Sequence, residues 1–222
     1  MISILTPTRG RVPQLTRMVE SARATAKGPI EFSFFVDDDD VQSVSACVYL
    51  GAKYTLGPRS MIHSARWDEC LPNTSGEFLF SANDDIVFRT PGWDKMIEAE
   101  FAKFPDKILM VHGDDAGSQG ANFGCHPCVH LRWIETLGYF FPSYFDGEYP
   151  DTWVNDLANR IGRRRFLPFV TEHMHRIYGK AVIDETTLNY LRRQQIQNPA
   201  LIYKQKEAER IADEEKLRAV ML

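Results

Sequence analysis

The sequence of 222 residues has few cysteines and no long apolar run. Its four cysteines are too few for a disulfide-stapled secreted scaffold of this length, so we expect reduced thiols. No stretch approaches the roughly 20 apolar residues that a membrane-spanning helix needs. The N-terminal segment MISILTPTRGR has no basic stretch ahead of a long apolar core, which argues against a signal peptide. The expected location is cytoplasmic.

The sequence also lacks a strong charge imbalance. It contains 26 Lys and Arg against 30 Asp and Glu, a net charge of -4. A chain that mainly coats nucleic acid is usually basic, so this balance argues mildly against such a role. Four arginines do cluster, at Arg160, Arg163, Arg164 and Arg165. A solvated face is their ordinary interpretation, and a patch for an anionic acceptor, including nucleic acid, is the functional one.

Several common site motifs are missing. No Gly-x-Gly-x-x-Gly follows the first apolar run and no Gly-Lys-Ser/Thr loop occurs, which disfavours a dinucleotide fold and a P-loop enzyme. A single Cys-x-x-Cys pair, Cys125 and Cys128, is present. A structural zinc site usually needs four ligands, so apolar packing of these cysteines is the favoured interpretation.

What is present is an alternation of short apolar runs and helix-length amphipathic segments. Strands are predicted at 2–6, 32–36, 53–56, 78–81 and 108–111, and helices at about 13–26, 41–50, 60–71, 93–104 and 151–161. Residues 166–170 look extended, and the chain is helix-prone from about 185, with an interruption at Pro199. This pattern predicts an α/β fold with a mostly parallel central sheet, over residues 1–183, and a C-terminal helical extension over 184–222.

Polar clusters follow three of the predicted strands, at 6–11, 37–40 and 83–85. Ligands of open α/β sheets bind beyond the carboxyl ends of the strands. Adjacent carboxylates such as Asp84 and Asp85 repel each other unless a cation lies between them, and oxygen ligands favour magnesium or manganese. The alternative is that Asp84 and Asp85 form a turn, and that Asp39 and Asp40 cap the next helix.

The order of these segments resembles the GT-A glycosyltransferases, specifically small family-2-like members. The matching pieces are ISILTPTRGR, FSFFVDDDD, GPRSMIHSARWDEC, EFLFSANDDIVFRTPGWDKMI, YFDGEYPDTWVNDLANRIGRRRFLP and TEHMH, which together cover about residues 2–190. The resemblance implies a GT-A, Rossmann-like domain that binds a nucleoside-diphosphate sugar. It further implies a metal-dependent glycosyltransferase that moves the sugar, with a UDP-sugar as the first choice of donor, to an acceptor hydroxyl with inversion.

The resemblance also implies roles for individual residues on the nucleotide side. Thr6, Pro7 and Arg9 would line the nucleotide pocket, Asp37 would contact the base or ribose, Arg59 would lie near the nucleotide, and Asp84 would contact the ribose or sugar.

The metal site implied by the resemblance centres on Asp85. Asn83-Asp84-Asp85 would be the Asp-x-Asp-type motif that holds a divalent ion, manganese or magnesium, with Asp85 as the ligand. Asn83 departs from the motif, because an amide oxygen is a neutral and weaker ligand. A later histidine would return to the metal or diphosphate, with His173 as first choice and His175 as second. In an extended segment both point to one face, so their spacing does not choose between them.

Asp151 matches the place of the family's catalytic base. An acceptor hydroxyl is a poor nucleophile, and a carboxylate within hydrogen-bond reach can take its proton during attack on the anomeric carbon. The alternative role for Asp151 is to cap the helix that follows, which suits a Pro-Asp-Thr sequence.

Two other function classes remain open from the sequence. One is a sugar-phosphate nucleotidyltransferase, which the missing Gly-rich loop disfavours. The other is a non-catalytic protein that binds nucleotide, glycan or nucleic acid on a degenerate transferase scaffold, for which Asn83 is the direct support. The acceptor stays open among glycan, lipid, protein and modified nucleic acid.

Overall fold

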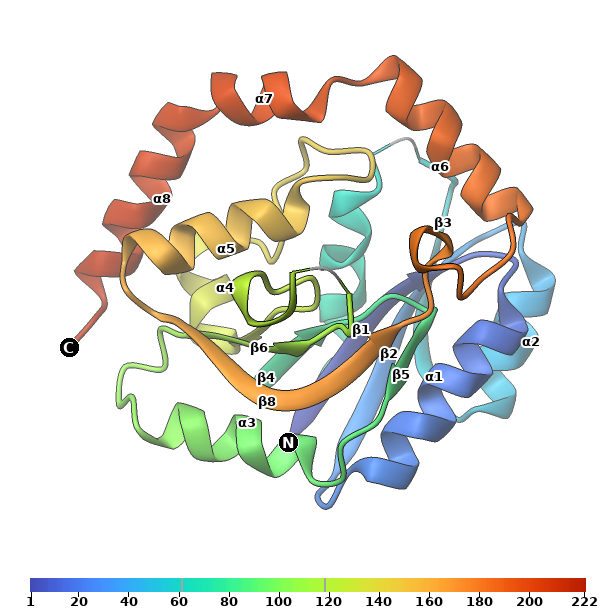
Figure 1. Ribbon diagram of the computed structural model, residues 1–222, viewed down its shortest axis with the longest axis horizontal. Helices are drawn as coiled ribbons and strands as arrows, with labels where there is room; N and C mark the ends of the chain where they lie inside the picture. Colours follow the sequence, from blue (N-terminus) through green and yellow to red (C-terminus); the bar gives the residue numbers. More distant parts are fainter. Residues whose placement is uncertain (61, 118) are drawn as a thin grey trace.

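Eight strands form one mixed sheet at the centre of the computed structural model, which describes residues 1–60, 62–117 and 119–222, without the side chains of Ile177 and Gln194 (Figure 1). The strands are β1 (Ile2–Thr8), β2 (Ile30–Asp37), β3 (Lys53–Gly57), β4 (Phe78–Ser81), β5 (Ile86–Phe88), β6 (Met110–Asp114), β7 (Cys128–His130) and β8 (Arg164–His173). Their order is β3-β2-β1-β4-β7-β6-β8-β5, and β3, β2, β1 and β4 run parallel. The α/β fold with a largely parallel sheet that the alternation predicts is therefore confirmed.

Helices cover both faces of this sheet. They are α1 (Val12–Thr25), α2 (Val41–Tyr49), α3 (Trp93–Ala102), α4 (Leu131–Leu137), α5 (Pro150–Arg160), α6 (Glu185–Ile196), α7 (Pro199–Gln205) and α8 (Glu207–Ala219). Successive side chains of a strand point to opposite faces. Accordingly, Ile4 packs in the core with α1, α2 and α3, whereas its neighbour Leu5 packs in a second core with α4, α5 and Leu217 of α8.

The segment 60–71 does not form the predicted α-helix. Its described residues instead form two short 3₁₀ helices, Ser64–Arg66 and Asp68–Asn73. Side chains of this segment are engaged elsewhere: the Ser64 hydroxyl donates to the Pro142 carbonyl at 2.7 Å, and Asp68 accepts the Phe140 N–H at 2.5 Å. Tertiary contacts thus override the local helical periodicity.

Three elements are absent from the sequence-based prediction: the strands β5 and β7 and the helix α4. Each strand has only three residues, too few to show a periodic pattern. Strand β8 is longer than expected and extends to His173, because β5 pairs with it in antiparallel register, Ile86 opposite His173. This pairing brings Asp85, which directly precedes β5, next to His173 at the end of β8.

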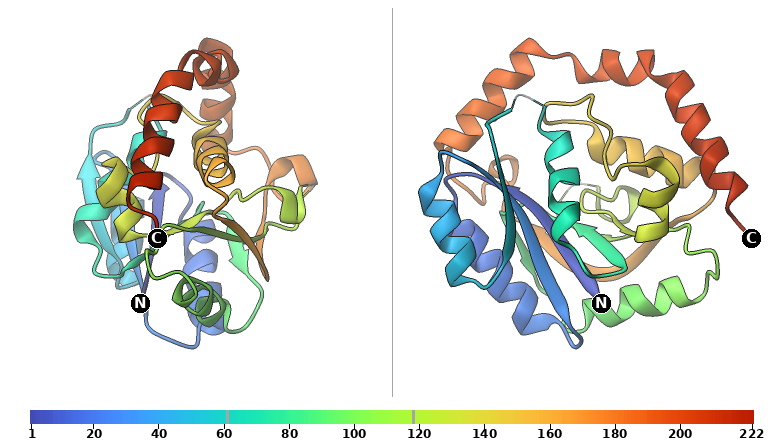
Figure 2. Two further views of the ribbon diagram at one scale, coloured as in Figure 1. Left: turned by 90° about the vertical axis from the view of Figure 1, so that its left-hand side faces the viewer. Right: turned by 180° about the vertical axis from the view of Figure 1, so that it is seen from behind.

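The C-terminal helices α6, α7 and α8 form an arc around one end of the molecule (Figures 1 and 2). The arc is anchored at α8, where the Arg210 guanidinium lies 3.6 Å from the ring centre of Tyr203 and 5.2 Å from that of Trp153 in α5. Tyr139 also hydrogen-bonds Asp213. None of the helices in the described part of the chain combines the length and apolar character needed to cross a bilayer.

Candidate active site

The strand register brings the polar ends of β1, β2 and β4 to one edge of the sheet. Thr8 of β1 lies opposite Val36 of β2, and Leu5 lies opposite Ser81 of β4. The residues that follow these strands are therefore neighbours in space. The Thr8 hydroxyl donates to Asp84 Oδ2 at 2.9 Å, which joins the first cluster to the third.

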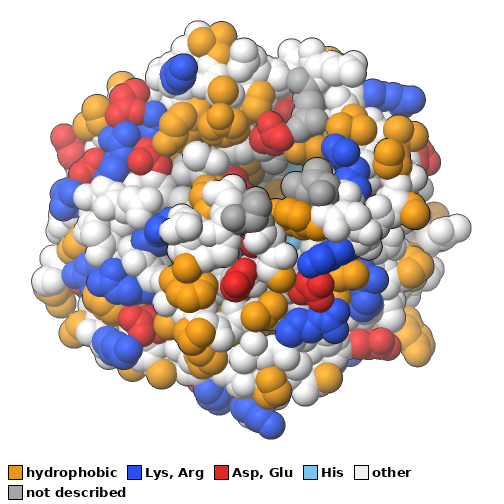
Figure 3. Space-filling model, viewed as in Figure 1, with side chains coloured by type: hydrophobic (Ala, Val, Ile, Leu, Met, Phe, Trp, Pro, Cys, Tyr) orange, Lys and Arg blue, Asp and Glu red, His pale blue; other side chains and the backbone are white. Residues whose placement is uncertain are grey.

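A cavity of about 620 Å³ opens at this edge. Its walls come from the ends of β1 and β2, the loop after β3, residues 83–85, the loop that follows β6, the start of α5, the end of β8, and α6. Figure 3 shows the hollow in this face, with histidine atoms visible inside it and both acidic and basic side chains near its rim.

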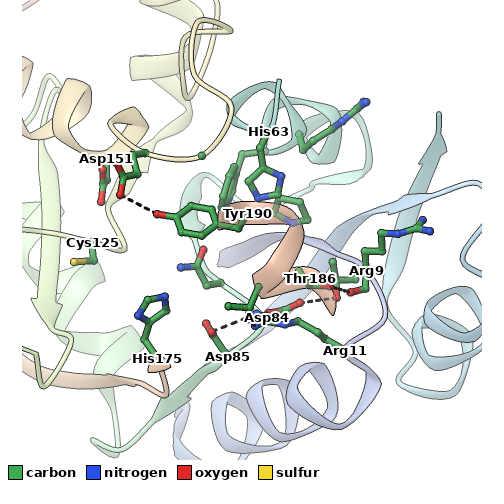
Figure 4. A pocket seen from close by; sticks show the side chains of 18 of the residues that line it. Arg9, Arg11, His63, Asp84, Asp85, Cys125, Asp151, His175, Thr186 and Tyr190 are labelled. Carbon is green, nitrogen blue, oxygen red and sulfur yellow. Dashed lines mark hydrogen bonds and ion pairs between the residues drawn. The ribbon is translucent and has the colours of Figure 1, made fainter. Parts of the chain in front are cut away.

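Arg11 is the central cation of the cavity and was not among the predicted site residues. Its guanidinium lies 2.9 Å from Asp84 Oδ1 and 3.3 Å from Asp85 Oδ2, and its Nε donates to Asp184 at 2.8 Å (Figure 4). Burial and the neighbouring Asp85 charge raise the pKa of Asp84, against the opposing effect of Arg11. The Arg11 side chain thus neutralises part of the negative charge of Asp84 and Asp85.

Asp85 and His173 face each other across the short β5–β8 ladder. Asp85 Oδ1 lies 3.1 Å from His173 Nε2, and the Met174 N–H donates to the Asp85 carbonyl at 2.9 Å. Burial alone would raise the pKa of Asp85, but the His173 contact and Arg11 outweigh it and lower that pKa. The ring of His175 lies farther along the chain, 5.0 Å from the His173 ring centre.

These groups fit a divalent ion. Asp85 Oδ1 and His173 Nε2, 3.1 Å apart, are an oxygen and a nitrogen of the kinds that hold divalent ions, and they are close enough for both to contact one ion. Asp85 Oδ1 is buried and, within the described part of the chain, makes no hydrogen bond of good geometry. No three His, Cys, Asp or Glu side chains converge as a full metal site among the residues described. The protein would supply Asp85 and His173, and the remaining positions suit diphosphate oxygens and water.

Asn83 lies beside this pair and also lines the cavity. Its side-chain nitrogen is 3.5 Å from His173 Nε2. The neutral amide therefore contacts the histidine, in the position where a stricter Asp-x-Asp motif would carry a carboxylate.

The predicted nucleotide residues occupy one end of the cavity. Pro7, Arg9, Asp37 and Arg59 line it, and Arg9 Nη1 lies 3.1 Å from Asp37 Oδ2. Thr6 is the exception: it is fully buried in β1 and does not belong to the cavity walls in the described structure. Thr6 shares a face of β1 with Thr8 but lies one pair of residues farther from the strand end, within the covered part of the sheet, whereas Pro7 and Thr8 at the end of the strand reach the cavity.

An aromatic wall that the sequence-based prediction omitted completes this end. Phe35 and Trp67 line it, and the Arg66 guanidinium lies 4.2 Å from the Phe35 ring centre. His63 packs on Trp67, with ring centres 5.1 Å apart. Phe35 and Trp67 are nearly fully buried, so these rings mainly support the Arg66 and His63 side chains at this wall.

The four-aspartate run divides into a cavity part and a structural part. Asp40 is the N-cap of α2, where its side chain accepts the Ser43 N–H at 3.1 Å. It also accepts the Gly10 N–H at 2.7 Å, which ties the β1–α1 turn to α2. The capping role expected for Asp40 is confirmed.

Asp151 lies at the other end of the cavity, in the first turn of α5. The residue at the N-cap position is Tyr149, with φ 79°, so Asp151 does not itself cap the helix. Asp151 Oδ1 accepts the Thr152 N–H at 2.8 Å, and burial raises the pKa of Asp151 to about 6. A partly buried carboxylate with a raised pKa at a cavity wall has the properties of a general base.

Two further acidic residues and a tyrosine of helix α6 line the cavity with Asp151. Asp115 and Glu148 line the same part of the cavity, and Cys125 Sγ lies 3.3 Å from Asp115 Oδ2. Tyr190 points from α6 toward this end, and its hydroxyl donates to Glu148 at 2.9 Å (Figure 4). In the sequence, the Asp114-Asp115 pair after the predicted strand 108–111 could have indicated this end of the cavity, whereas the spacing of α6 carries no such signal.

The arginine cluster and Cys128 lie outside this chemistry, whereas Cys125, the other half of the Cys-x-x-Cys pair, lines the cavity. Arg160 pairs with Asp156 at 2.9 Å and with Glu207 at 2.7 Å, and Arg163 pairs with Asp106 at 3.0 Å. These intramolecular partners account for much of the cluster's charge, as a structural role requires. Cys128 is fully buried in the core, in agreement with apolar packing.

The architecture is the GT-A-like fold of glycosyltransferases, with the cavity at the carboxyl ends of the first strands. Comparison with solved structures supports this assignment. The mannosyltransferase PcManGT from Pyrobaculum calidifontis, solved with GDP-Man and Mn²⁺, has a TM-score of 0.57 at 16% identity, over 76% of this chain and 56% of that one. Residues 1–349 of S. aureus TarS, solved with UDP-GlcNAc, have a TM-score of 0.59 at 12% identity, over 84% and 63%.

A mycobacterial protein has a TM-score of 0.57 at 15% identity, over 89% of this chain and 76% of that one. No protein-family model matches the chain, and no curated protein matches its sequence. The chain spans less than two thirds of the length of the mannosyltransferase and the TarS fragment. The likeness therefore concerns the fold, which agrees with the resemblance that the motifs indicate.

Proposed function

We propose that this chain is a metal-dependent, inverting glycosyltransferase that uses a nucleoside-diphosphate sugar, with a UDP-sugar as first choice. The carrying observation is that Asp85 and His173 converge at 3.1 Å in the same cavity that Asp151 lines. Support comes from similar folds solved with GDP-Man and Mn²⁺ and with UDP-GlcNAc. The acceptor is a hydroxyl compound of a class still to be identified.

The nucleotide belongs at the end of the cavity lined by Pro7, Arg9, Asp37 and Arg59. Asp37 accepts hydrogen bonds from the base or ribose, and Arg9 holds the Asp37 carboxylate in place at 3.1 Å. Asp84, fixed by Thr8 and Arg11, accepts hydrogen bonds from the ribose or the sugar. The diphosphate then lies between these groups and Asp85.

Asp85 and His173 would hold the divalent ion, manganese or magnesium. When bound, such an ion neutralises charge on a diphosphate leaving group. Arg11 lies beside both aspartates, and its positive charge favours their ionised forms.

Asp151 acts as the general base. Its carboxylate takes the proton of the acceptor hydroxyl as the acceptor oxygen bonds to the anomeric carbon. The bond from that carbon to the diphosphate oxygen breaks, and the nucleoside diphosphate leaves with the electron pair. Attack from the face opposite the leaving group inverts the anomeric configuration. The pKa of Asp151 near 6 leaves it ionised at neutral pH and still basic enough to accept a proton.

A binding and turnover experiment tests this function. UDP and GDP are titrated into the protein by calorimetry with and without MnCl₂, and UDP-sugars and GDP-mannose are then followed for nucleotide release. We expect nucleoside-diphosphate binding that requires the ion, and slow donor hydrolysis even without an acceptor. Release of pyrophosphate from a nucleoside triphosphate would instead identify a nucleotidyltransferase. Binding without turnover across a broad donor and acceptor panel would identify a non-catalytic binder.

A crystal soaked with UDP and Mn²⁺ provides the direct structural check. The ion should contact Asp85 and His173, with the diphosphate beside it. An ion far from Asp85, or a nucleotide bound elsewhere, contradicts the proposal.

Two further expectations stay predictions. One is the cytoplasmic location. The other is the division into a catalytic domain, 1–183, and a helical extension, 184–222. Helix α6 lies in the extension but lines the cavity together with residues of 1–183.

A further inference from the structure

Helix α6 presents one face to the cavity although it lies in the C-terminal extension. Thr186, Tyr190 and Arg193 line the cavity, and their spacing of four and three residues places them on one side of the helix. On the other side, Glu185, Leu188 and Arg192 are exposed. The helix thus forms a wall of the cavity.

Contacts at both ends of α6 hold this wall in place. Near its start, the Thr186 hydroxyl donates to the Arg9 carbonyl at 2.9 Å, and Asp184 pairs with Arg11 at 2.8 Å. Beyond its end, Gln197 Nε2 donates to the Tyr144 carbonyl at 3.0 Å. Two of the N-terminal contacts go to the β1 turn that also holds Asp84 and Asp37, so α6 is joined directly to the nucleotide end of the cavity.

Tyr190 fixes the middle of the helix. Its ring lies so close to Gly147 that a Cβ added there would be 2.9 Å from the ring. Its hydroxyl bonds Glu148 of the acidic end, and Arg193 follows about one helical turn further along the same side of α6.

Arg193 lies on the nucleotide side of the cavity and, within the described part of the chain, has no carboxylate within ion-pair distance. Burial and the charge of Arg59 lower the pKa of Arg193, against the opposing effect of the Asp146 and Asp37 carboxylates. Its Nε is buried and, in the described part of the structure, has no hydrogen-bond partner. Asp37 is already paired with Arg9. The cation is therefore incompletely neutralised by the protein.

Other side chains near Arg193 also affect the charge at this end of the cavity. His63 is held neutral, because burial together with Arg193 and Arg66 lowers its pKa to about 3. Arg59, Arg66 and Arg193 all line the cavity near Asp37, whereas Asp146, the other carboxylate whose charge acts on Arg193, is not among the described residues that line it. Cationic side chains that face a cavity together favour an anionic ligand there.

We propose that α6 is part of the donor site and that Arg193 binds a phosphate oxygen of the nucleoside-diphosphate donor. This inference rests on the proposed function, since that function supplies the anionic ligand. A guanidinium with an unused N–H suits a charge-assisted bond to phosphate. Arg193 is then a binding residue that the C-terminal extension contributes to a site whose other parts belong to residues 1–183.

The test compares the charged nucleotide with its uncharged nucleoside. UDP binding in the presence of MnCl₂ is measured by calorimetry, and uridine binding by ligand-observed NMR, which detects millimolar affinities. Arg193→Ala and Arg193→Gln are compared with Arg192→Ala, which removes the same charge from the exposed side of the same helix. Thermal melting without ligand reports whether each variant is folded.

We expect both Arg193 variants to weaken UDP about 10- to 100-fold, as loss of a hydrogen bond to a charged group does. Uridine binding should be unchanged, Arg192→Ala should bind UDP as the wild type does, and Arg193→Lys should recover part of the affinity. Unchanged UDP affinity in a folded Arg193→Gln variant overturns the inference and leaves the proposed function intact. Equal loss of UDP and uridine also overturns it, because the residue then only shapes the pocket. A wild-type protein that binds no nucleoside diphosphate refutes the proposed function itself.

Discussion

The two ends of the cavity are built in different ways. The nucleotide end follows the parallel strands β1, β2 and β4, whose register fixes Thr8, Asp37 and Asp84 beside one another. The end that Asp151 lines is assembled from loops, the start of α5 and the C-terminal helix α6. The first end is therefore set by the sheet, and the second by contacts between distant segments.

The two ends also differ in charge. Arg9, Arg59 and Arg193 lie at the nucleotide end, whereas Asp115, Glu148 and Asp151 lie at the other. Such a division suits an anionic donor at one end and proton transfer from a hydroxyl at the other. It predicts that substitutions at the acidic end change turnover and substitutions at the nucleotide end change affinity.

The largest expected effect is that of Asp151→Asn on turnover. Removing a general base lowers the rate about 10²- to 10⁴-fold. UDP affinity with manganese should be unchanged, because Asp151 lies away from the nucleotide residues. Steady-state transfer rates and calorimetry measure the two quantities.

Asp156→Asn is the matched control for this variant. It changes the same type of side chain on the same helix, where Asp156 pairs with Arg160 outside the cavity. Turnover should stay near that of the wild type. If Asp151→Asn kept full transfer activity, the base assignment would be wrong.

The difference between the two ends explains which site residues could be predicted from the sequence. The strand-end clusters were predictable, because an apolar run followed by Asp37 or Asp84-Asp85 identifies a strand and its carboxyl end. Thr6 was misplaced because the pattern did not show that β1 continues to Thr8 and that only its last residues reach the cavity.

The other end could not be assembled from sequence patterns. Tyr190 and Arg193 reach the cavity only because α6 folds back onto the β1 turn, a contact between residues more than 170 positions apart. The choice of His173 over His175 as the neighbour of Asp85 likewise depends on the three-residue strand β5, which has no periodicity of its own. Arg11 was visible in the sequence, but its three carboxylate partners were not.

A smaller effect is expected at the metal, where His173 and His175 can be compared directly. His173→Ala should weaken Mn²⁺ binding, measured in the presence of UDP, by about 10- to 100-fold or more, since even indirect partners of a metal contribute that much. His175→Ala should change it little, because the structure places His173 rather than His175 against Asp85. Equal losses in both variants would assign the ion to a position between the two rings.

The pH dependence of turnover tests the acidic end without a substitution. Asp151 accepts a proton only as the carboxylate, and burial raises its pKa to about 6. With saturating donor and metal, the turnover rate should fall about tenfold per pH unit well below pH 6 and level off above about pH 7. A rate that is flat from pH 5 to pH 8 at constant ionic strength would remove Asp151 from the proton transfer step.

The smallest effect separates Asp37 from Asp40 within one acidic run. Asp40→Ala removes the cap of α2 and the acceptor of the Gly10 N–H, so the free energy of unfolding should fall by about 1–2 kcal/mol in urea denaturation. UDP affinity should change little, because Asp40 does not line the cavity in the described structure.

Asp37→Asn should do the reverse, with weaker UDP binding at nearly unchanged stability, since Asp37 lies at the cavity wall and pairs with Arg9. The same two measurements on both variants thus test whether the nucleotide end depends on the sheet for its position and on Asp37 for its chemistry; a large loss of UDP affinity in a folded Asp40→Ala variant would show that the two roles are not separable.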